Sequence, residues 1–268
     1  MTLLVAAPDA DAARPACGAK IAKPTGGSWR CTFADEFSGG ALDRSKWSVM
    51  TTASSGFSHA FECYVDDRST VNVANGSLNL TARKLSSPAP CGYLFSSPYQ
   101  SGMVHTKSSF AQTYGRFEAR IKLPTGRGLH GAWWMWPRDM AYGKQSGEID
   151  IAEHYGAYPD IVSPYVHIND DGVQRGKGAY CNLATAESGF HQYVVEWLPL
   201  VGFRFIYDGN VCMTFNNWDP GAPLSYPQPF DKSFFLNLTL AMGWGVNSVD
   251  STTPFPATMS VDYVRAWS

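Results

Sequence analysis

Residues 115–123, GRFEARIKL, decide the fold, because apolar and charged side chains alternate along this stretch. The apolar positions are Phe117, Ala119, Ile121 and Leu123, and the charged positions are Arg116, Glu118, Arg120 and Lys122. Successive side chains of a β-strand point to opposite faces of its sheet, so the stretch predicts a half-buried strand. Such strands are typical of antiparallel sheets.

The same alternation recurs in both directions along the chain. It is present at residues 77–84 (SLNLTARK), 191–198 (HQYVVEWL), 203–215 (FRFIYDGNVCMTF) and 258–267 (TMSVDYVRAW). Asp208-Gly209, between two such runs, predicts a hairpin turn. We therefore expect an all-β sandwich of two antiparallel sheets, with jelly-roll topology and a concave face that can carry a substrate cleft.

The length of 268 residues suits one large β domain. Residues 1–28 are rich in Ala, Pro, Gly and Asp without periodicity, so we expect a flexible leader or the remnant of an export signal there. The single domain is then expected at 29–268. The sequence contains no apolar run long enough to cross a bilayer, which argues against a membrane partner.

Charge and aromatic content narrow the function classes. The formal net charge is -2 and charged residues make up 16%, which argues against a nucleic-acid partner. Aromatic residues reach 14%, with 9 Trp and 13 Tyr, and such rings either fill a core or bind flat apolar faces such as those of sugars. We expect a monomer, and sugars are one class of partner whose rings offer such faces.

The six cysteines have no spacing typical of a zinc site, so they predict disulfides and secretion into an oxidising compartment. Several pairings are possible, and six free thiols are the alternative. We favour pairs of sequence neighbours, which are Cys17 with Cys31, Cys63 with Cys91, and Cys181 with Cys212.

Residues 146–156, SGEIDIAEHYG, are the most informative for function. In a strand, Glu148 and Asp150 share one face. Strict alternation would send Glu153 to the other face, but a β-bulge adds one residue and returns it to the same row. We therefore predict a bulge at this point of the strand.

Three carboxyl groups in one row repel each other, and crowding and burial drive their pKa values apart. Retaining glycoside hydrolysis uses such a pair about 5 Å apart, one as nucleophile and one as general acid/base. Glu148 fits the nucleophile and Glu153 the acid/base, while Asp150 between them would tune the proton's position. The alternative is a solvated acidic strand edge.

The neighbouring stretch GLHGAWWMWP, residues 128–137, carries Trp133, Trp134 and Trp136. This is more indole than an ordinary edge strand contains. Adjacent side chains of a strand face opposite sides, so one of Trp133 and Trp134 belongs to the core and the other can face a cleft. We expect Trp134 to be the cleft residue.

Together these segments resemble glycoside hydrolase family 16, whose Glu-x-Asp-x-x-Glu signature matches Glu148, Asp150 and Glu153. Further similar segments, in the same order, are 33–47 (FADEFSGGALDRSKW), 75–84 (NGSLNLTARK), 114–137 (YGRFEARIKLPTGRGLHGAWWMWP), 190–197 (FHQYVVEW) and 259–267 (MSVDYVRAW). The resemblance implies a β-jelly-roll, a retaining mechanism without a catalytic cofactor, and an open cleft for polysaccharide.

The extra residue of the motif, Ala152, makes the chain similar to the laminarinases and agarases of that family. The implied activity is an endo-β-1,3-glucanase that also accepts mixed β-1,3/1,4 linkages. The alternatives are an agarase-like galactan hydrolase, a transglycosylase, and a non-catalytic glucan-binding protein. The last typically lacks one of the two glutamates, and this chain keeps both.

The resemblance also implies further site residues. Substrate contacts are implied for Trp134, Trp133 and His167, the last on the strand beside Glu153. A structural Ca²⁺ is implied on the convex side, with Glu36 and Asp262 as oxygen ligands.

Departures from the family pattern affect sugar recognition. In LTLAMGW, residues 238–244, Thr239 replaces a polar amide and Trp244 replaces a glycine. Thr70 stands where an Asn is common, and Arg68, a substrate-binding candidate, is shifted by one position. Trp244 is either a new stacking platform or a core residue.

Overall fold

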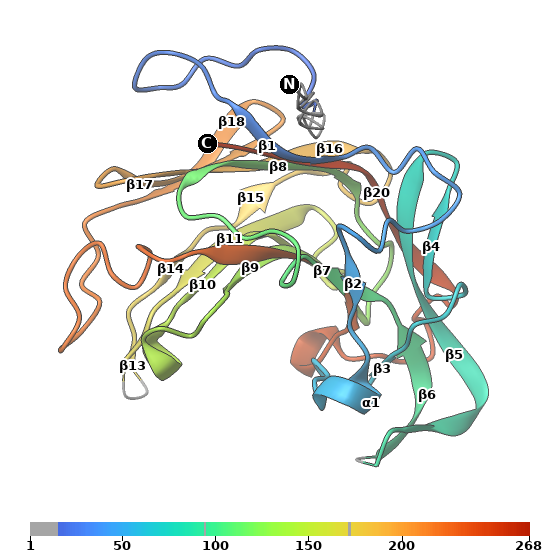
Figure 1. The fold of residues 1–268 in the computed structure, drawn as a ribbon. Helices are drawn as coiled ribbons and strands as arrows, with labels where there is room; N and C mark the ends of the chain where they lie inside the picture. The colour runs from blue at the N-terminus through green and yellow to red at the C-terminus, as the bar shows by residue number, and fades with distance from the viewer. Residues whose placement is uncertain (1–15, 94, 171–172) are drawn as a thin grey trace, which may run out of the picture.

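Two β-sheets packed face to face form the body of the protein (Figure 1). The computed structural model describes residues 16–93, 95–170 and 173–268. The two packed sheets confirm the expected jelly-roll sandwich. In Figure 1, β5 and β6 leave the upper layer and descend on one side toward the short helix α1.

The larger sheet has ten strands and contains the stretch that decided the fold. Its main path runs β18 (Asn210–Phe215), β17 (Gly202–Tyr207), β16 (His191–Leu198), β8 (Gly115–Lys122), β20 (Ala257–Trp267), β5 (Ser77–Cys91), β6 (Phe95–Ser101) and β3 (Cys63–Tyr64). In addition, β1 (Cys31–Asp35) pairs with β20, and β4 (Val71–Ala74) pairs with β5. Its pairs are antiparallel except that of β3 with β6, which is parallel.

The smaller sheet has eight strands and carries the carboxylate motif. Its path runs β14 (Lys177–Gly178), β11 (Ile161–His167), β10 (Glu148–Tyr155), β9 (Leu129–Pro137), β19 (Phe234–Met242), β7 (Met103–His105) and β2 (Ser48–Val49), with β15 (Cys181–Asn182) paired to β11. The remaining elements are β12 (Asn169–Asp170), β13 (Val173–Gln174), α1 (Thr52–Ser55), η1 (Gly143–Gln145) and η2 (Gly245–Asn247).

The strand β8 shows why these residues form a sandwich. Phe117, Ala119 and Ile121 are fully buried in the core between the sheets, as the alternation predicts. The charged face is more buried than expected, because Arg116 donates to Glu118 and to Glu196, at 2.6 and 2.9 Å. Burial costs less free energy for paired charges than for an unpaired charge.

The other strands expected from alternation are also present. Residues 77–84 lie in β5, 191–198 form β16, and 258–267 lie in β20. The Asp208-Gly209 turn joins β17 to β18, and Asp208 has a positive φ of 47°. Asp and Gly adopt this left-handed conformation more easily than other residues, which explains the hairpin signal.

The expected leader only partly coincides with a separate segment. Residues 1–15 lie outside the described residues. From residue 16 the chain is attached to the domain: Cys17 is buried against Trp29 and Trp267, and Ala22 forms a bridge with Ser28. The structured unit therefore begins before Trp29, because a disulfide and a small apolar cluster hold this segment.

The favoured cysteine pairing is confirmed in full. Disulfides join Cys17 to Cys31, Cys63 to Cys91 and Cys181 to Cys212. The last of these joins β15 of the eight-stranded sheet to β18 of the ten-stranded sheet. Among the described residues, no helix has the length and apolar character needed to cross a bilayer.

Candidate active site

The predicted bulge lies in β10, between Asp150 and Glu153. Asp150 pairs with Tyr165 of β11 and Glu153 pairs with Ser163, so three steps along β10 match two steps along β11. The pairing with β9 shifts at the same place, between Asp150 and Ala152. The extra residue turns the carboxyl group of Glu153 to the side of the other two.

All three carboxyl groups line one pocket of about 660 Å³ on the eight-stranded sheet. We call it the catalytic pocket. Aromatic side chains from the neighbouring strands line it too, among them Trp134 and Trp136 of β9 and Phe235 of β19. Acidic groups beside indole rings suit a sugar, whose ring presents both an apolar face and hydroxyl groups.

At one end of the row, Glu148 and Asp150 are crowded. Their carboxylate oxygens and a ring nitrogen of His167 lie within 4.8 Å of one another, and His167 Nε2 is 2.9 Å from Asp150 Oδ2. Burial, followed by the charge of Asp150, raises the pKa of Glu148 well above its usual value. Burial and the charge of Glu153 raise the pKa of Asp150 well above its usual value. This end of the row therefore retains a proton readily.

At the other end of the row, two neighbouring side chains hydrogen-bond Glu153. Its Oε1 lies 3.1 Å from Nε2 of His130 and accepts a hydrogen bond of 2.9 Å from the Tyr155 hydroxyl. The rings of His130 and Tyr155 are stacked, with centroids 4.3 Å apart. Burial alone would raise the pKa of Glu153, but the hydrogen bonds from His130 and Tyr155 and the charge of His130 lower it below its usual value.

The two adjacent tryptophans divide as the alternation predicts. Trp134 lines the catalytic pocket, and its Nε1 donates to Thr239 Oγ1 at 2.9 Å. Thr239 thus fixes the indole ring. Trp133 is fully buried in the core between the sheets, so its expected contact with substrate is wrong. The two residues are consecutive, and one step along a strand reverses the face.

Three other expected site residues have different outcomes. His167 lines the catalytic pocket, but its register partner is Glu148 and its 2.9 Å contact is with Asp150, so it lies at the opposite end of the row from Glu153. Trp244 is 66% exposed and lines the pocket, which excludes the core alternative. Arg68 is exposed in the turn between β3 and β4 and does not line the catalytic pocket.

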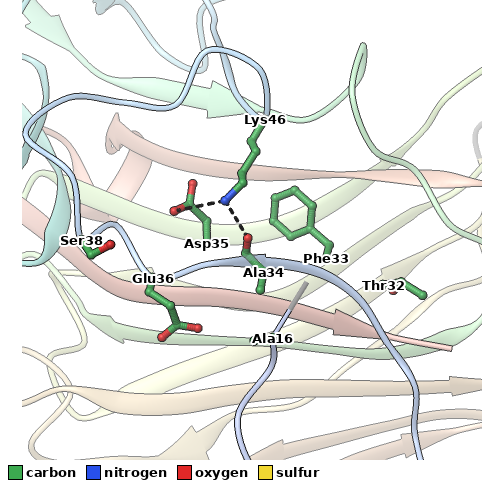
Figure 2. Close-up of a pocket in the computed structure, with 8 residues that line it drawn as sticks. All are labelled: Ala16, Thr32, Phe33, Ala34, Asp35, Glu36, Ser38 and Lys46. Atoms are coloured by element: carbon green, nitrogen blue, oxygen red, sulfur yellow. Dashed lines mark hydrogen bonds and ion pairs between the residues drawn. The ribbon is translucent and has the colours of Figure 1, made fainter. Parts of the chain in front are cut away.

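The expected calcium ligands do not form a calcium site. Glu36 accepts two hydrogen bonds of 2.7 Å from Arg265, and Asp262 Oδ2 is 2.7 Å from a guanidinium nitrogen of Arg120. Figure 2 shows the pocket beside Glu36, where the Lys46 ammonium donates to the Ala34 carbonyl at 2.9 Å and lies 3.8 Å from Asp35.

Calcium requires six or more oxygen ligands that are free to bind it. Arg265 binds both carboxylate oxygens of Glu36, Arg120 binds one oxygen of Asp262, and Lys46 binds the carbonyl oxygen of Ala34, two residues before Glu36. These residues therefore do not fit a calcium ion, and the expected assignment of Glu36 and Asp262 is not supported.

Sequence reasoning missed His130 and Tyr155, the two partners of Glu153. The signal was available, because His130, Ala132, Trp134 and Trp136 are spaced by two along β9 and so share a face. Tyr155 follows Glu153 by two residues on β10 in the same way.

Comparisons with known proteins show the family to which the chain belongs. A family model described as "Glycosyl hydrolases family 16" matches residues 57–264. A beta-glucanase of Rhodothermus marinus is 34% identical over 89% of this chain and 85% of its own length. A glucan endo-1,3-beta-glucosidase A1 of Niallia circulans is 33% identical over 88% of this chain, which spans 37% of that longer relative. The solved laminarinase of Rhodothermus marinus has a TM-score of 0.77 at 32% identity, covering 89% of this chain and 97% of that one.

Proposed function

The chain belongs to glycosyl hydrolases family 16, and from this premise we propose that it is an endo-β-1,3-glucanase with Glu148 as nucleophile and Glu153 as acid/base. It is a glycoside hydrolase of a family that cleaves with retention and needs no catalytic cofactor. The observation that carries the proposal is the bulge of β10, which brings both glutamates to one pocket beside Trp134.

In the first step, the Glu148 carboxylate attacks the anomeric carbon of the sugar. The bond from that carbon to the leaving oxygen breaks, and Glu153 gives its proton to this oxygen. In the second step, water attacks the same carbon and gives a proton to Glu153, and the Glu148 carboxylate leaves. Trp134, fixed by Thr239, would stack on the sugar face.

Asp150 supplies a reason for Glu148 to be ionised. A proton held by Asp150 removes the negative charge that, after burial, contributes most to the raised pKa of Glu148. The carboxyl group of Asp150 could then donate a hydrogen bond to the Glu148 carboxylate, with the contact to His167 holding its other side.

The lowered pKa of Glu153 in the free protein runs against its role as an acid. Its place in the motif, rather than this pKa, carries the assignment. A bound sugar would remove water from the carboxyl group, and desolvation raises a carboxyl pKa. The proposal therefore requires that substrate binding bring a proton to Glu153.

A digest of three polysaccharides tests the function. We expect new reducing ends from laminarin, fewer from mixed-linkage β-1,3/1,4-glucan, and none from agarose. A rapid fall in viscosity with few reducing ends would indicate cleavage within the chain. Cleavage of agarose alone would overturn the β-glucan assignment and favour the galactan hydrolase.

We further infer that the protein is secreted and acts as a monomer. The three disulfides support an oxidising compartment. Size-exclusion chromatography of the active fraction and recovery of activity outside the cell check these two inferences.

A further inference from the structure

Ile151 lies at the centre of the β10 bulge that brings Glu153 to the catalytic pocket. The register pairs with β9 and with β11 both skip this residue, although the structure describes both strands in full. A β-bulge disrupts the ladder locally and leaves its extra residue without a partner there. Ile151 is fully buried, so bulk water does not reach it. A buried carbonyl without a donor costs free energy, and the bulge therefore needs a donor from elsewhere.

The neighbouring strand β11 has no amide to offer at this point. Its residue facing the bulge is Pro164, which lies between the register partners of Asp150 and Glu153. Proline has no backbone N–H, and within sheets it is found at edges and at bulges. The missing donor must therefore be a side chain.

That side chain comes from the other sheet. Tyr207 is the last residue of β17, which lies in the upper layer of Figure 1, whereas β10 lies in the lower layer. The side chain of Tyr207 is buried in the core between the sheets, and its hydroxyl donates to the Ile151 carbonyl at 2.7 Å. Burial raises the pKa of Tyr207 well above its usual value, so the hydroxyl keeps the proton that it donates.

We propose that Tyr207 is a positioning residue for Glu153, because its hydroxyl fixes the bulged peptide that turns the acid/base toward the catalytic pocket. Ile151 precedes Glu153 by two residues, so the orientation of its peptide decides which side of the sheet the glutamate faces. Tyr207 acts through the backbone, since the described lining of the catalytic pocket does not include it. The inference rests on the proposed function and adds to it a residue of the opposite sheet.

The nucleophile does not depend on this hydrogen bond. Glu148 precedes the bulge, in a stretch of β10 whose register with β11 is regular. After the bulge, the ring nitrogens of the buried His154 lie 3.0 Å from the Ile161 carbonyl oxygen and from a carboxylate oxygen of Glu187, two contacts that hold the strand there. Loss of the hydroxyl should therefore move the acid/base and leave the nucleophile in place.

Tyr193 on β16 provides a matched control in the same core. It is the register partner of Tyr207, and the two buried rings are T-shaped, with centroids 5.0 Å apart. The Tyr193 hydroxyl, however, has no hydrogen-bond partner among the described residues. Its removal should be neutral or slightly stabilising, whereas removal of the Tyr207 hydroxyl leaves the Ile151 carbonyl unpaired.

The kinetic test uses two substrates that share a glycone and differ in their need for an acid. Laminarin requires a proton on the leaving oxygen, whereas the nitrophenol of nitrophenyl β-laminaribioside leaves without one. For Tyr207→Phe, we expect kcat on laminarin to fall about tenfold with KM unchanged, and the burst rate constant on the nitrophenyl glycoside to stay within about twofold of the wild type. Tyr193→Phe should match the wild type on both substrates.

Two kinetic outcomes would overturn the proposal. An unchanged kcat on laminarin in Tyr207→Phe would show that Glu153 does not depend on the hydroxyl. An equal fall of kcat and of the burst rate constant would show a general disturbance of the site, because the nucleophile would then be affected as much as the acid.

Amide hydrogen exchange gives a reading that does not depend on activity. Phenylalanine preserves the ring and its packing, so Tyr207→Phe should fold, with Tm lowered by about 4 °C. Below that temperature, peptides that cover β10 should exchange about tenfold faster in Tyr207→Phe than in the wild type or in Tyr193→Phe, while peptides that cover β20 should not change. Unchanged exchange of β10 would contradict the proposal even if the rate on laminarin fell.

The exchange measurement also separates this inference from the proposed function. If the wild type cleaves neither laminarin nor mixed-linkage glucan, the β-glucanase proposal fails. The exchange of β10 in the two variants would still decide whether the Tyr207 hydroxyl holds the bulge.

Discussion

The two ends of β10 carry the same chemical group in opposite surroundings. At the Glu148 end, a second acid, Asp150, lies within 4.8 Å, and burial and repulsion raise the pKa of both. At the Glu153 end, His130 and Tyr155 hydrogen-bond the carboxylate and lower its pKa. The difference teaches that neighbours, and not residue type, set the charge of each acid.

A full account of Glu153 includes every charged or titratable group near it. These are His130 on β9, Tyr155, Asp150 and Glu148 on β10, His167 on β11, and His59 before β3, whose ring centroid is 4.7 Å from that of His130. Burial and the charge of His130 lower the pKa of His59. Any pH profile therefore belongs to this group of residues as a whole.

The largest expected effect comes from Glu148→Gln. The amide cannot form the sugar ester, so kcat on laminarin should fall by about 10⁴-fold or more. Polysaccharide binding should persist, because the aromatic walls remain. Activity assays and affinity electrophoresis in laminarin gels measure the two properties, and a near-normal rate would remove Glu148 from the mechanism.

Glu153→Ala should cost about 10²- to 10⁴-fold on laminarin, the usual contribution of a general acid. Nitrophenol leaves without a proton, so the first step with nitrophenyl β-laminaribioside should be affected much less. Burst kinetics on that substrate separate this step from ester hydrolysis. Equal losses in the first step on both substrates would mean that another group protonates the leaving oxygen.

His130→Phe tests what lowers the pKa of Glu153 relative to the acids at the other end of β10. The ring can still stack on Tyr155, but the hydrogen bond to Glu153 is lost, so the pKa of Glu153 should rise. We expect the basic limb of the kcat/KM profile to move up by about one pH unit, and the rate at the optimum to fall about tenfold.

Tyr155→Phe removes a hydrogen bond to the same oxygen, Glu153 Oε1, and serves as the comparison. Its basic limb should move in the same direction by a smaller amount. A fall in rate without any movement of the limb, in both variants, would assign them a purely structural role.

The smallest effects concern stability, and they should have opposite signs at the two ends. The raised pKa of Asp150 means that its ionised form costs stability above the unfolded pKa, so Asp150→Asn should raise the free energy of unfolding at pH 7 by about 1 kcal/mol. The lowered pKa of Glu153 means that its ionised form stabilises the fold, so Glu153→Gln should lower that free energy by about 1 kcal/mol.

Both differences should shrink in acid: that of Asp150 as the pH falls from its raised folded pKa to the unfolded pKa, and that of Glu153 as the pH falls from the unfolded pKa through its lowered folded pKa. Urea unfolding at pH 7 and in acid measures this. The same sign for both variants at pH 7 would contradict the proposed contrast.

The sequence predicted what depends on local periodicity. Alternation placed the core of β8, separated Trp133 from Trp134, and with one added residue located the bulge before Glu153. The predicted pairing of cysteines that are neighbours in the sequence was also confirmed. These features depend on the order of residues along one strand or on short separations.

What the sequence did not predict depends on contacts between distant segments. Arg265 neutralises Glu36 across more than 200 positions, which removes an expected calcium ligand. Arg68 does not line the catalytic pocket, and His167 lies near Asp150 instead of Glu153 because strand register pairs it with Glu148. Register between strands is set by packing and cannot be read from one strand alone.

The disulfide between Cys181 and Cys212 has a consequence for maturation. It fastens the edges of the two layers to each other, immediately after Tyr180 in the chain. In a reducing compartment, β15 would be held by its two-residue pairing with β11, while β10 would already be complete. The strand that carries the catalytic residues therefore does not depend on this disulfide, which would form only in an oxidising medium.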